Sequence, residues 1–284
     1  MTKCGTVVLA GKPNVGKSTL LNALVGERLS IVSPKPQSTR TPVVGLLTHG
    51  DAQFIFTDCP GLLDPRYRLQ EVLRQTALRA LADAEVIAYL HPLADYPAPS
   101  LAAAAGLTAT PAGAVVTVYT KADLVAPPRR PALALDSVAV SAQSGEGMSA
   151  LVRRLERHLP ESPFHYPADD VATQPLRFFA AEFVREAAFA LLHAELPYSL
   201  ACEIDEFREG ETPTYIRAVV YVERESQKGI VIGQGGRTIK AIGQAARTRF
   251  EMLYGRPVYL DLHVKVLPHW RTHDPSIKRL GYAP

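Results

Sequence analysis

The sequence is poor in cysteine and has no long apolar run, and each shortage excludes a class of protein. Its three cysteines, Cys4, Cys59 and Cys202, are too few and too widely spaced for a disulfide framework, which favours a reducing compartment. No apolar stretch approaches the roughly 18 residues that a membrane-spanning helix needs. The N-terminus runs almost directly into a strand-like segment, so no signal peptide is expected. Together these features predict a soluble, cytoplasmic protein.

The size of the chain and its charge distribution suggest two domains with different surfaces. A chain of 284 residues exceeds the usual size of one domain. The net charge is only +3, but residues 226–284 carry ten Lys/Arg against three Asp/Glu, whereas residues 175–225 carry five against ten. A basic C-terminal segment beside an acidic one suggests a face that binds a polyanion, although charge runs are more often solvated surface.

The first 160 residues alternate short apolar runs with helical patterns. This alternation predicts an α/β domain with a mixed, mostly parallel sheet. The expected strands are 6–10, 44–47, 53–57, 86–90, 115–119 and 138–140, and the expected helices are 17–24, 69–81 and 148–158. Segment 96–113 is rich in Ala and Pro and is expected to form a loop with one weak helix.

Four prolines between 160 and 175 mark the expected linker, residues 161–175, between a domain at 1–160 and a second domain at 176–284. The second domain is expected to be a small α+β unit. Its helices are predicted at 177–192 and 237–253, and its strands at 200–207, 215–223 and 258–266. The last strand alternates strictly between apolar and other residues, which is typical of a sheet with one buried face.

A phosphate-binding loop is the strongest motif of the first domain. The pattern GxxxxGK(S/T) is matched by Gly11, Lys12, Pro13, Asn14, Val15, Gly16, Lys17 and Ser18, between an apolar strand and a helix, as the motif requires. In such a loop successive backbone N–H groups point at phosphate oxygens near a helix N-terminus. Lys17 is expected to reach the β- and γ-phosphates and Ser18 to ligate Mg²⁺.

Two further segments predict hydrolysis of the γ-phosphate. The pattern DxxG is matched by Asp58, Cys59, Pro60 and Gly61 at the end of a strand. Asp58 is expected to bind Mg²⁺ through water, and the switch-loop residue Thr39 to close onto Mg²⁺ and the γ-phosphate. Lys17, Thr39 and the Gly61 amide are thus the expected catalytic groups. Leu62 stands where Ras-like enzymes carry a water-positioning Gln, so intrinsic hydrolysis should be slow.

The remaining motifs of this domain point to guanine. The run Thr120, Lys121, Ala122 and Asp123 follows a strand and resembles the pattern NKxD of GTPases, with Thr120 at the Asn position. A carboxylate at Asp123 accepts hydrogen bonds from N1–H and the 2-amino group of guanine, whereas adenine offers neither donor there. Further along, a backbone N–H for guanine O6 is expected from Ser141, Ala142 and Gln143. GTP and GDP, with Mg²⁺, are therefore the predicted ligands.

The second domain carries a GxxG loop, residues 233–236, directly before a helix. In a KH domain this loop brings the protein backbone close to a nucleic-acid backbone. Basic residues surround it, and the expected RNA-binding residues are Lys228, Ile230, Val231, Ile232, Gly233, Gln234, Gly235, Gly236, Arg237 and Lys240. The nearby histidines 263, 269 and 273 match no standard metal-ligand set. Trp270 is interpreted either as a base-stacking residue or as an anchor for the C-terminal tail.

The combination resembles the Era family of GTPases over essentially the whole length. The segments that carry the resemblance are 11–22, 58–62, 195–199 (ELPYS), 222–233 (VERESQKGIVIG) and 258–262 (VYLDL). The resemblance implies a type II KH domain that binds the single-stranded 3′ region of small-subunit ribosomal RNA during ribosome assembly. It also implies peripheral association with the inner face of the cell membrane. We further expect a monomer.

Several positions depart from the family's pattern. Cys59 replaces Thr, Thr120 replaces Asn, and the GxxG loop lacks its usual lysines. Asn14 lies where potassium-dependent relatives in the broader GTPase class carry a cation-ligating Asn, which leads to the hypothesis that K⁺ stimulates hydrolysis.

Three interpretations stay open at this point. The first is a GTP-switched, RNA-binding assembly factor. The second is a GTPase whose C-terminal domain docks on a protein or a membrane, and the third is an RNA-binding protein with a degraded nucleotide site.

Overall fold

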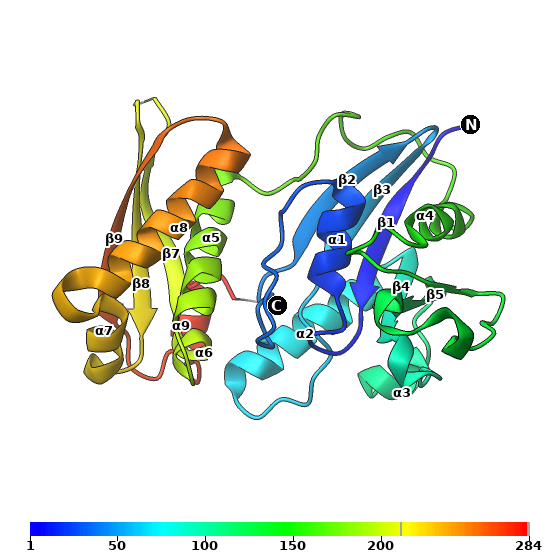
Figure 1. Cartoon of the computed structure of the whole chain (residues 1–284), viewed down its shortest axis with the longest axis horizontal. Helices are drawn as coiled ribbons and strands as arrows, with labels where there is room; N and C mark the ends of the chain where they lie inside the picture. The colour runs from blue at the N-terminus through cyan, green and yellow to red at the C-terminus, as the bar shows by residue number, and fades with distance from the viewer. Residues whose placement is uncertain (211, 283–284) are drawn as a thin grey trace. The chain divides into compact units, whose positions relative to one another are not determined.

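The computed structural model describes residues 1–210 and 212–282; residue 211 and the last two residues of the predicted C-terminal domain, 283 and 284, lie outside the described part. The chain divides into two compact units (Figure 1). Of the described residues, the first unit comprises 1–66 and 70–173, and the second comprises 67–69 and 174–282. In the described residues, no helix is long and apolar enough to cross a membrane.

The first unit is built on a six-stranded sheet of order β2-β3-β1-β4-β5-β6. Only β2 pairs antiparallel, with β3, and all other pairs are parallel, so the predicted mixed, mostly parallel sheet is confirmed. The strands are β1 (Lys3–Ala10), β2 (Val43–His49), β3 (Ala52–Asp58), β4 (Val86–Pro92), β5 (Ala114–Thr120) and β6 (Ser137–Ala139). Parallel strands buried on both faces read as continuous apolar runs, which explains why they were visible in the sequence.

Four helices accompany this sheet: α1 (Lys17–Val25), α2 (Arg68–Ala82), α3 (Leu101–Ala105) and α4 (Met148–Glu156). Short 3₁₀ turns follow β4 and β5, namely η1 (Leu93–Asp95), η2 (Ala122–Leu124) and η3 (Pro127–Arg129). Helices α2 and α3 pack on the face of the sheet that includes Val8, Ile87 and Tyr89. Helix α3 is the weak helix that the sequence predicts within segment 96–113, where Ser100 caps its N-terminus.

Much of the predicted linker lies against the edge of this sheet. The side-chain oxygen of the fully buried Gln53 accepts hydrogen bonds from the backbone N–H groups of His165 (2.9 Å) and Tyr166 (3.1 Å), and its amide nitrogen donates to Tyr166 O (2.8 Å). Further along, Leu46 N donates to Val171 O at 3.0 Å. We call residues 161–172 the strap. It is attached to the two strands that follow the switch loop, β2 and β3.

The second unit has a three-stranded sheet of order β7-β8-β9, formed by β7 (Ala201–Arg208), β8 (Thr214–Val222) and β9 (Val258–Val266). β7 and β8 are antiparallel, and β8 and β9 are parallel. Helices α5 (Leu176–Leu191) and α8 (Arg237–Tyr254) cover one face (Figure 1), where Val184, Ala188, Ile242 and Ala246 pack on β8. The unit is completed by α6 (Leu196–Ser199), α7 (Glu225–Ile232), η4 (Gln234–Gly236) and α9 (Asp274–Arg279).

Helix α7, directly before the GxxG loop, is absent from the elements that the sequence predicts. Its apolar periodicity is weak, since Val231 is its one fully buried residue and Gly229 interrupts it. The helix nevertheless has a defined start, because the Gln227 side chain accepts hydrogen bonds from the backbone N–H groups of Glu223 (2.9 Å) and Arg224 (3.1 Å). The sequence carries only half of the usual capping signature, because Gln227 stands at the third helical position but Arg224, rather than Ser, Thr, Asp or Asn, stands at the N-cap.

Trp270 anchors the chain after β9 rather than stacking on a base. It is fully buried, its indole N–H donates to Ser199 O at 2.8 Å, and its ring stacks on Tyr282 at 5.8 Å between centroids. The structure therefore decides between the two interpretations that the sequence left open.

Candidate functional site

The phosphate loop is shaped by close backbone packing. Gly11 has φ 150°, and a Cβ there would lie 2.6 Å from the Leu90 carbonyl oxygen, so only glycine fits. Gly16, with φ 105°, ends the loop where α1 begins. The loop thus turns sharply between β1 and α1, and the N-terminus of α1 faces the cavity that the loop borders.

Lys17 is a buried cation held over this loop. Its side chain reaches back, so that Nζ donates to the carbonyl oxygens of Gly11 (3.2 Å) and Lys12 (3.0 Å). Burial lowers the pKa of Lys17, and the nearby Asp58 carboxylate acts in the opposite direction. A charged ammonium in so dry a position attracts anions strongly.

Ser18, Thr39 and Asp58, predicted as magnesium ligands, converge on one point. Ser18 Oγ donates to Asp58 Oδ2 at 2.6 Å, Thr39 Oγ1 donates to the same oxygen at 3.2 Å, and the two hydroxyl oxygens lie 3.0 Å apart. Burial raises the pKa of Asp58, an effect that Lys17 and Ser18 oppose. Asp58 Oδ1 is buried and has no hydrogen-bond partner among the described residues. Hard oxygen donors with an unsatisfied carboxylate oxygen fit Mg²⁺.

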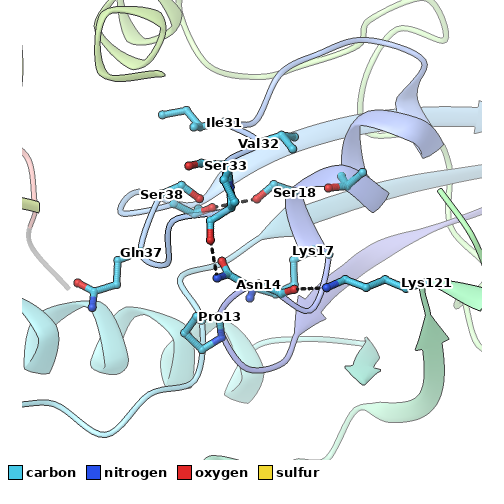
Figure 2. A pocket seen from close by; sticks show the side chains of 15 residues that line it. Pro13, Asn14, Lys17, Ser18, Ile31, Val32, Ser33, Gln37, Ser38 and Lys121 are labelled. Atoms are coloured by element: carbon cyan, nitrogen blue, oxygen red, sulfur yellow. Dashed lines mark hydrogen bonds between the residues drawn. The ribbon is translucent and has the colours of Figure 1, made fainter. Parts of the chain in front are cut away.

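A cavity of about 430 Å³ opens over these groups (Figure 2). Asn14 Nδ2 donates to Pro34 O at 2.9 Å, which ties the phosphate loop to the segment after α1. The cavity is lined by Pro13, Asn14, Gly16, Lys17, Ser18, Thr19, Ile31, Val32, Ser33, Pro34, Gln37, Ser38, Thr39, Gly61 and Lys121. Residues 31–34 carry no motif, so nothing in the sequence marks them as part of this cavity.

The DxxG segment approaches the phosphate loop closely. Leu62 N donates to Gly11 O at 2.9 Å, and a Cβ on Gly61 would lie only 2.7 Å from Pro13 N. The side chains of Leu62 and Cys59 point into the hydrophobic core beside α2, where burial raises the pKa of Cys59 to about 12. The side chain of Leu62 is therefore turned away from the cavity.

A second cavity, of about 280 Å³, joins the segments predicted to bind guanine. It is lined by Gly16, Thr19, Leu20, Thr120, Lys121, Asp123, Leu124, Val140, Ala142 and Gln143. Ala122 N donates to Val140 O at 3.1 Å, which holds the two loops side by side. Ser141 is buried beside the cavity, and its N–H is engaged by Glu146 O at 2.9 Å. Asp123, Ala142 and Gln143 thus line one space, as guanine recognition requires.

Thr120 and Lys121 connect this second cavity to the phosphate loop. Thr120 Oγ1 donates to Val15 O at 2.6 Å. Lys121 Nζ donates to Asn14 O at 2.9 Å, as Figure 2 shows. A hydroxyl in place of the usual amide therefore still joins β5 to the loop.

In the second unit, the GxxG loop lies at the surface and has a backbone conformation that favours glycine. Gly233, Gly235 and Gly236 all have positive φ, at 73°, 59° and 78°. Around Gly235 and Gly236 nothing lies within 4 Å of an added Cβ. Ile230, Gln234, Arg237 and Lys240 are exposed around the loop, and Lys228 and Ile232 are partly exposed. Val231 needs a correction, because its side chain is fully buried in the core and out of reach of RNA.

A groove next to this loop was not found from the sequence. It has a volume of about 430 Å³ and is lined by Ile239, Lys240, Gly243, Gln244, Arg247, Tyr259, Leu260 and Leu262 of α8 and β9. At Gly243 an added Cβ would lie 3.3 Å from Leu262, so glycine keeps the groove open. The signal was the helical spacing of Lys240, Gln244 and Arg247, but only the pairing of α8 with β9 makes it a groove.

Other charged groups near the loop have structural roles. Arg249 lies 3.8 Å from Glu186 and 4.5 Å from the centre of the Phe183 ring, away from the groove. His263 contacts Asp261 at 3.1 Å. Within residues 1–210 and 212–282, no three His, Cys, Asp or Glu side chains gather as a metal site would require.

Comparison with known proteins identifies the domain family of each unit. A family model described as a 50S ribosome-binding GTPase matches residues 6–118, and a KH domain model matches residues 195–271. The fold and the site thus define a P-loop GTPase domain followed by a KH domain. GTPase Era of Carboxydothermus hydrogenoformans is 40% identical over 299 residues, which cover 99% of this chain and 98% of the relative. GTPase Era of Thermotoga maritima is also 40% identical, with 96% and 94% covered. The chain belongs to the Era family of GTPases.

Solved structures agree with this assignment. An Aquifex aeolicus Era variant bound to GDP·AlF₄⁻ is 36% identical and matches with a TM-score of 0.92 over the full length of both chains. Era in complex with MgGDPNP and nucleotides 1506–1542 of 16S ribosomal RNA matches with the same identity, TM-score and coverage.

Proposed function

We propose that this GTPase is an RNA-binding switch in small ribosomal subunit assembly, which binds the 3′ region of small-subunit ribosomal RNA. The observation that carries the proposal is the presence, in one chain, of the Ser18–Thr39–Asp58 cluster and of an exposed GxxG loop beside a basic groove. The structure of an Era protein with MgGDPNP and 16S RNA supports the same pairing of ligands.

In the proposed nucleotide site, the loop 11–18 and residues 58–62 surround the phosphates. Ser18 and Thr39 contribute hydroxyl oxygens to the magnesium site, and Asp58 completes it through water. When bound, Mg²⁺ neutralises charge that develops on the β- and γ-phosphate oxygens. Lys17 adds a buried positive charge, and the Gly61 N–H donates to the γ-phosphate. Because Thr39 belongs to the segment between α1 and β2, loss of the γ-phosphate would release that segment.

The proposed guanine site is the second cavity. Residues 120–123 and 141–143 border it, with Asp123 as the acceptor for the guanine edge. The bonds from Thr120 and Lys121 to the phosphate loop speak against a degraded nucleotide site, because they hold the base loop and the phosphate loop together without the usual Asn.

The proposed RNA site joins the GxxG loop to the groove between α8 and β9. Positive φ and the missing Cβ groups let the RNA backbone approach residues 233–236. Lys228, Arg237, Lys240 and Arg247 would contact phosphates. Unpaired bases would lie over Ile239, Leu260 and Leu262, with the exposed Tyr259 ring at the rim.

Binding of an RNA oligonucleotide with the 3′-terminal sequence of 16S ribosomal RNA tests this proposal. We expect tighter binding with GDPNP than with GDP, and an affinity that falls steeply with salt because phosphate contacts release counterions. The control is an oligonucleotide of the same composition in reversed order. Equal binding of both oligonucleotides would contradict recognition of the 3′ region, and absent or salt-independent binding would favour a domain that docks on a protein or membrane instead.

We also propose a cytoplasmic location with a peripheral contact at the inner cell membrane, and a monomeric state. The membrane contact rests on the family resemblance, and the cytoplasmic location rests on the sparse cysteines. Cell fractionation with and without high salt tests the location, and light scattering of the purified full chain tests the oligomeric state.

A further inference from the structure

Arg130 bridges the two loops that border the guanine cavity. It follows η3, and its side chain is about three-quarters buried. Arg130 Nη2 donates to Ala122 O at 2.8 Å, and Nε donates to Val125 O at 2.9 Å. Both carbonyls belong to the turn that contains Asp123. Arg130 Nε and Nη2 therefore attach the guanidinium group to the turn that contains Asp123.

Arg130 Nη1 and Nη2 also attach the guanidinium group to Glu146, in the loop after β6. Arg130 Nη1 pairs with Glu146 Oε1, and Nη2 lies 3.2 Å from Glu146 Oε2, so the carboxylate is held at both oxygens. The backbone carbonyl oxygen of Glu146 in turn accepts a hydrogen bond from the Ser141 N–H. Through Glu146, Arg130 thus reaches the short segment 141–143 that lines the same cavity.

The Asp123 and Glu146 carboxylates carry like charges, which favours a cation such as Arg130 near them. The Arg130 hydrogen bond lowers the pKa of Glu146, whereas the nearby Asp123 carboxylate tends to raise it. Two carboxylates near each other repel, and a cation between them removes the repulsion. The pair is partly exposed, so salt screens its charge, and the geometry of the planar fork matters more than charge alone.

We propose that Arg130 is a positioning residue for guanine recognition, which holds the Asp123 turn and the 141–146 loop at a set separation. Neither Arg130 nor Glu146 lines the cavity, so the effect passes through Asp123, Ala142 and Gln143. This inference rests on the proposed guanine site and deepens it. Arg130 lies on no motif of the GTPase pattern.

The test compares GDP with IDP, whose base lacks the 2-amino group from which Asp123 would accept a hydrogen bond. In Arg130→Ala we expect GDP affinity to fall about tenfold, the equivalent of one charge-assisted hydrogen bond. IDP affinity should fall less, so the GDP-to-IDP ratio should shrink by about threefold. Glu146→Gln, which keeps the shape of the side chain, should shift the ratio in the same direction. Arg129→Ala, at the adjacent exposed arginine, is the matched control and should leave both affinities unchanged.

Arg130→Lys separates geometry from charge. It keeps the charge, but one ammonium nitrogen cannot reproduce the separate contacts that Arg130 Nε, Nη1 and Nη2 make, so we expect it to recover less than half of the lost selectivity. Full recovery with lysine, or an unchanged GDP-to-IDP ratio in a folded Arg130→Ala protein, would overturn the inference. If the wild-type chain itself bound GDP, IDP and ADP equally, the proposed guanine site would fail, which is a different outcome.

Discussion

The hydroxyl of Thr120 donates a 2.6 Å hydrogen bond to the backbone carbonyl of Val15, and this bond joins the end of β5 to the phosphate loop. Thr120 is almost fully buried, so the bond is shielded from water. The departure from the usual Asn therefore preserves the connection between base site and phosphate site, with a shorter side chain.

Thr120→Val removes this hydroxyl and keeps the shape of the side chain. The Val15 carbonyl then loses its partner, at a cost of about 1–3 kcal/mol. We expect GDP affinity to fall about fivefold, with a lower melting temperature of the nucleotide-free protein. Calorimetric titration and thermal unfolding measure both, with Thr120→Ser as the control that retains the hydroxyl. Wild-type affinity in the valine variant would show that the bond does not support the site.

Guanine selectivity should depend on Asp123. Asp123→Asn loses two charge-assisted hydrogen bonds worth about 1.5–3 kcal/mol each, so GTP affinity should fall by at least about tenfold. The amide should favour xanthine nucleotides, whose 2-oxo group accepts its N–H. Competition between GTP and XTP for the variant checks the switch. Unchanged preference for GTP would remove Asp123 from the base site.

RNA binding should depend on the GxxG loop and not on the nucleotide site. Changing Gln234 and Gly235 together to Asp places two negative charges where phosphates would approach, and both positions are exposed. Asp tolerates the positive φ of Gly235 better than most residues. We expect RNA affinity to fall by about tenfold or more. GTP hydrolysis without RNA is the control and should match wild type; normal RNA binding by the folded variant would contradict the KH assignment.

Potassium should stimulate hydrolysis more than sodium at equal ionic strength. Asn14 Nδ2 is engaged by Pro34 O, which leaves the amide oxygen as the group for a cation. Asn14→Ala, which removes the amide oxygen, should abolish the difference between the two salts. Turnover measured in KCl and NaCl, with and without RNA, checks the hypothesis. Equal rates in the two salts, both with RNA and without it, would reject a role for K⁺.

The strap should detach when Gln53 is shortened. Gln53→Ala removes the acceptor of the His165 and Tyr166 N–H groups, and we expect the free energy of unfolding to fall by about 2 kcal/mol. Proteolysis within residues 161–172 should become faster. Gln234→Ala, at an exposed glutamine, is the stability control. A variant with unchanged stability and an equally protected strap would show that Gln53 contributes little.

Several features depended on contacts between distant residues and could not be predicted. The groove beside the GxxG loop forms only where α8 and β9 meet, and in the sequence alone Arg247 and Tyr259 each look like ordinary surface residues. Val231 is predicted to bind RNA, but α7 turns its side chain into the core. The proline-rich segment is predicted to be an interdomain linker, and nothing local indicates that Gln53, more than a hundred residues away, binds it.

Local patterns in the chain were enough to predict the order of strands and helices in the first unit, the phosphate loop, the DxxG segment and the position of the GxxG loop. These features depend on residues close together in the chain, where apolar periodicity, glycine conformations and strand-to-helix turns act locally. The folded chain was needed to see that Ser18, Thr39 and Asp58 share one point, that Thr120 bonds to Val15, and that Arg130 joins two loops. A hydrogen bond depends on the positions of two groups in space, and one sequence pattern permits many such pairings until the core packs.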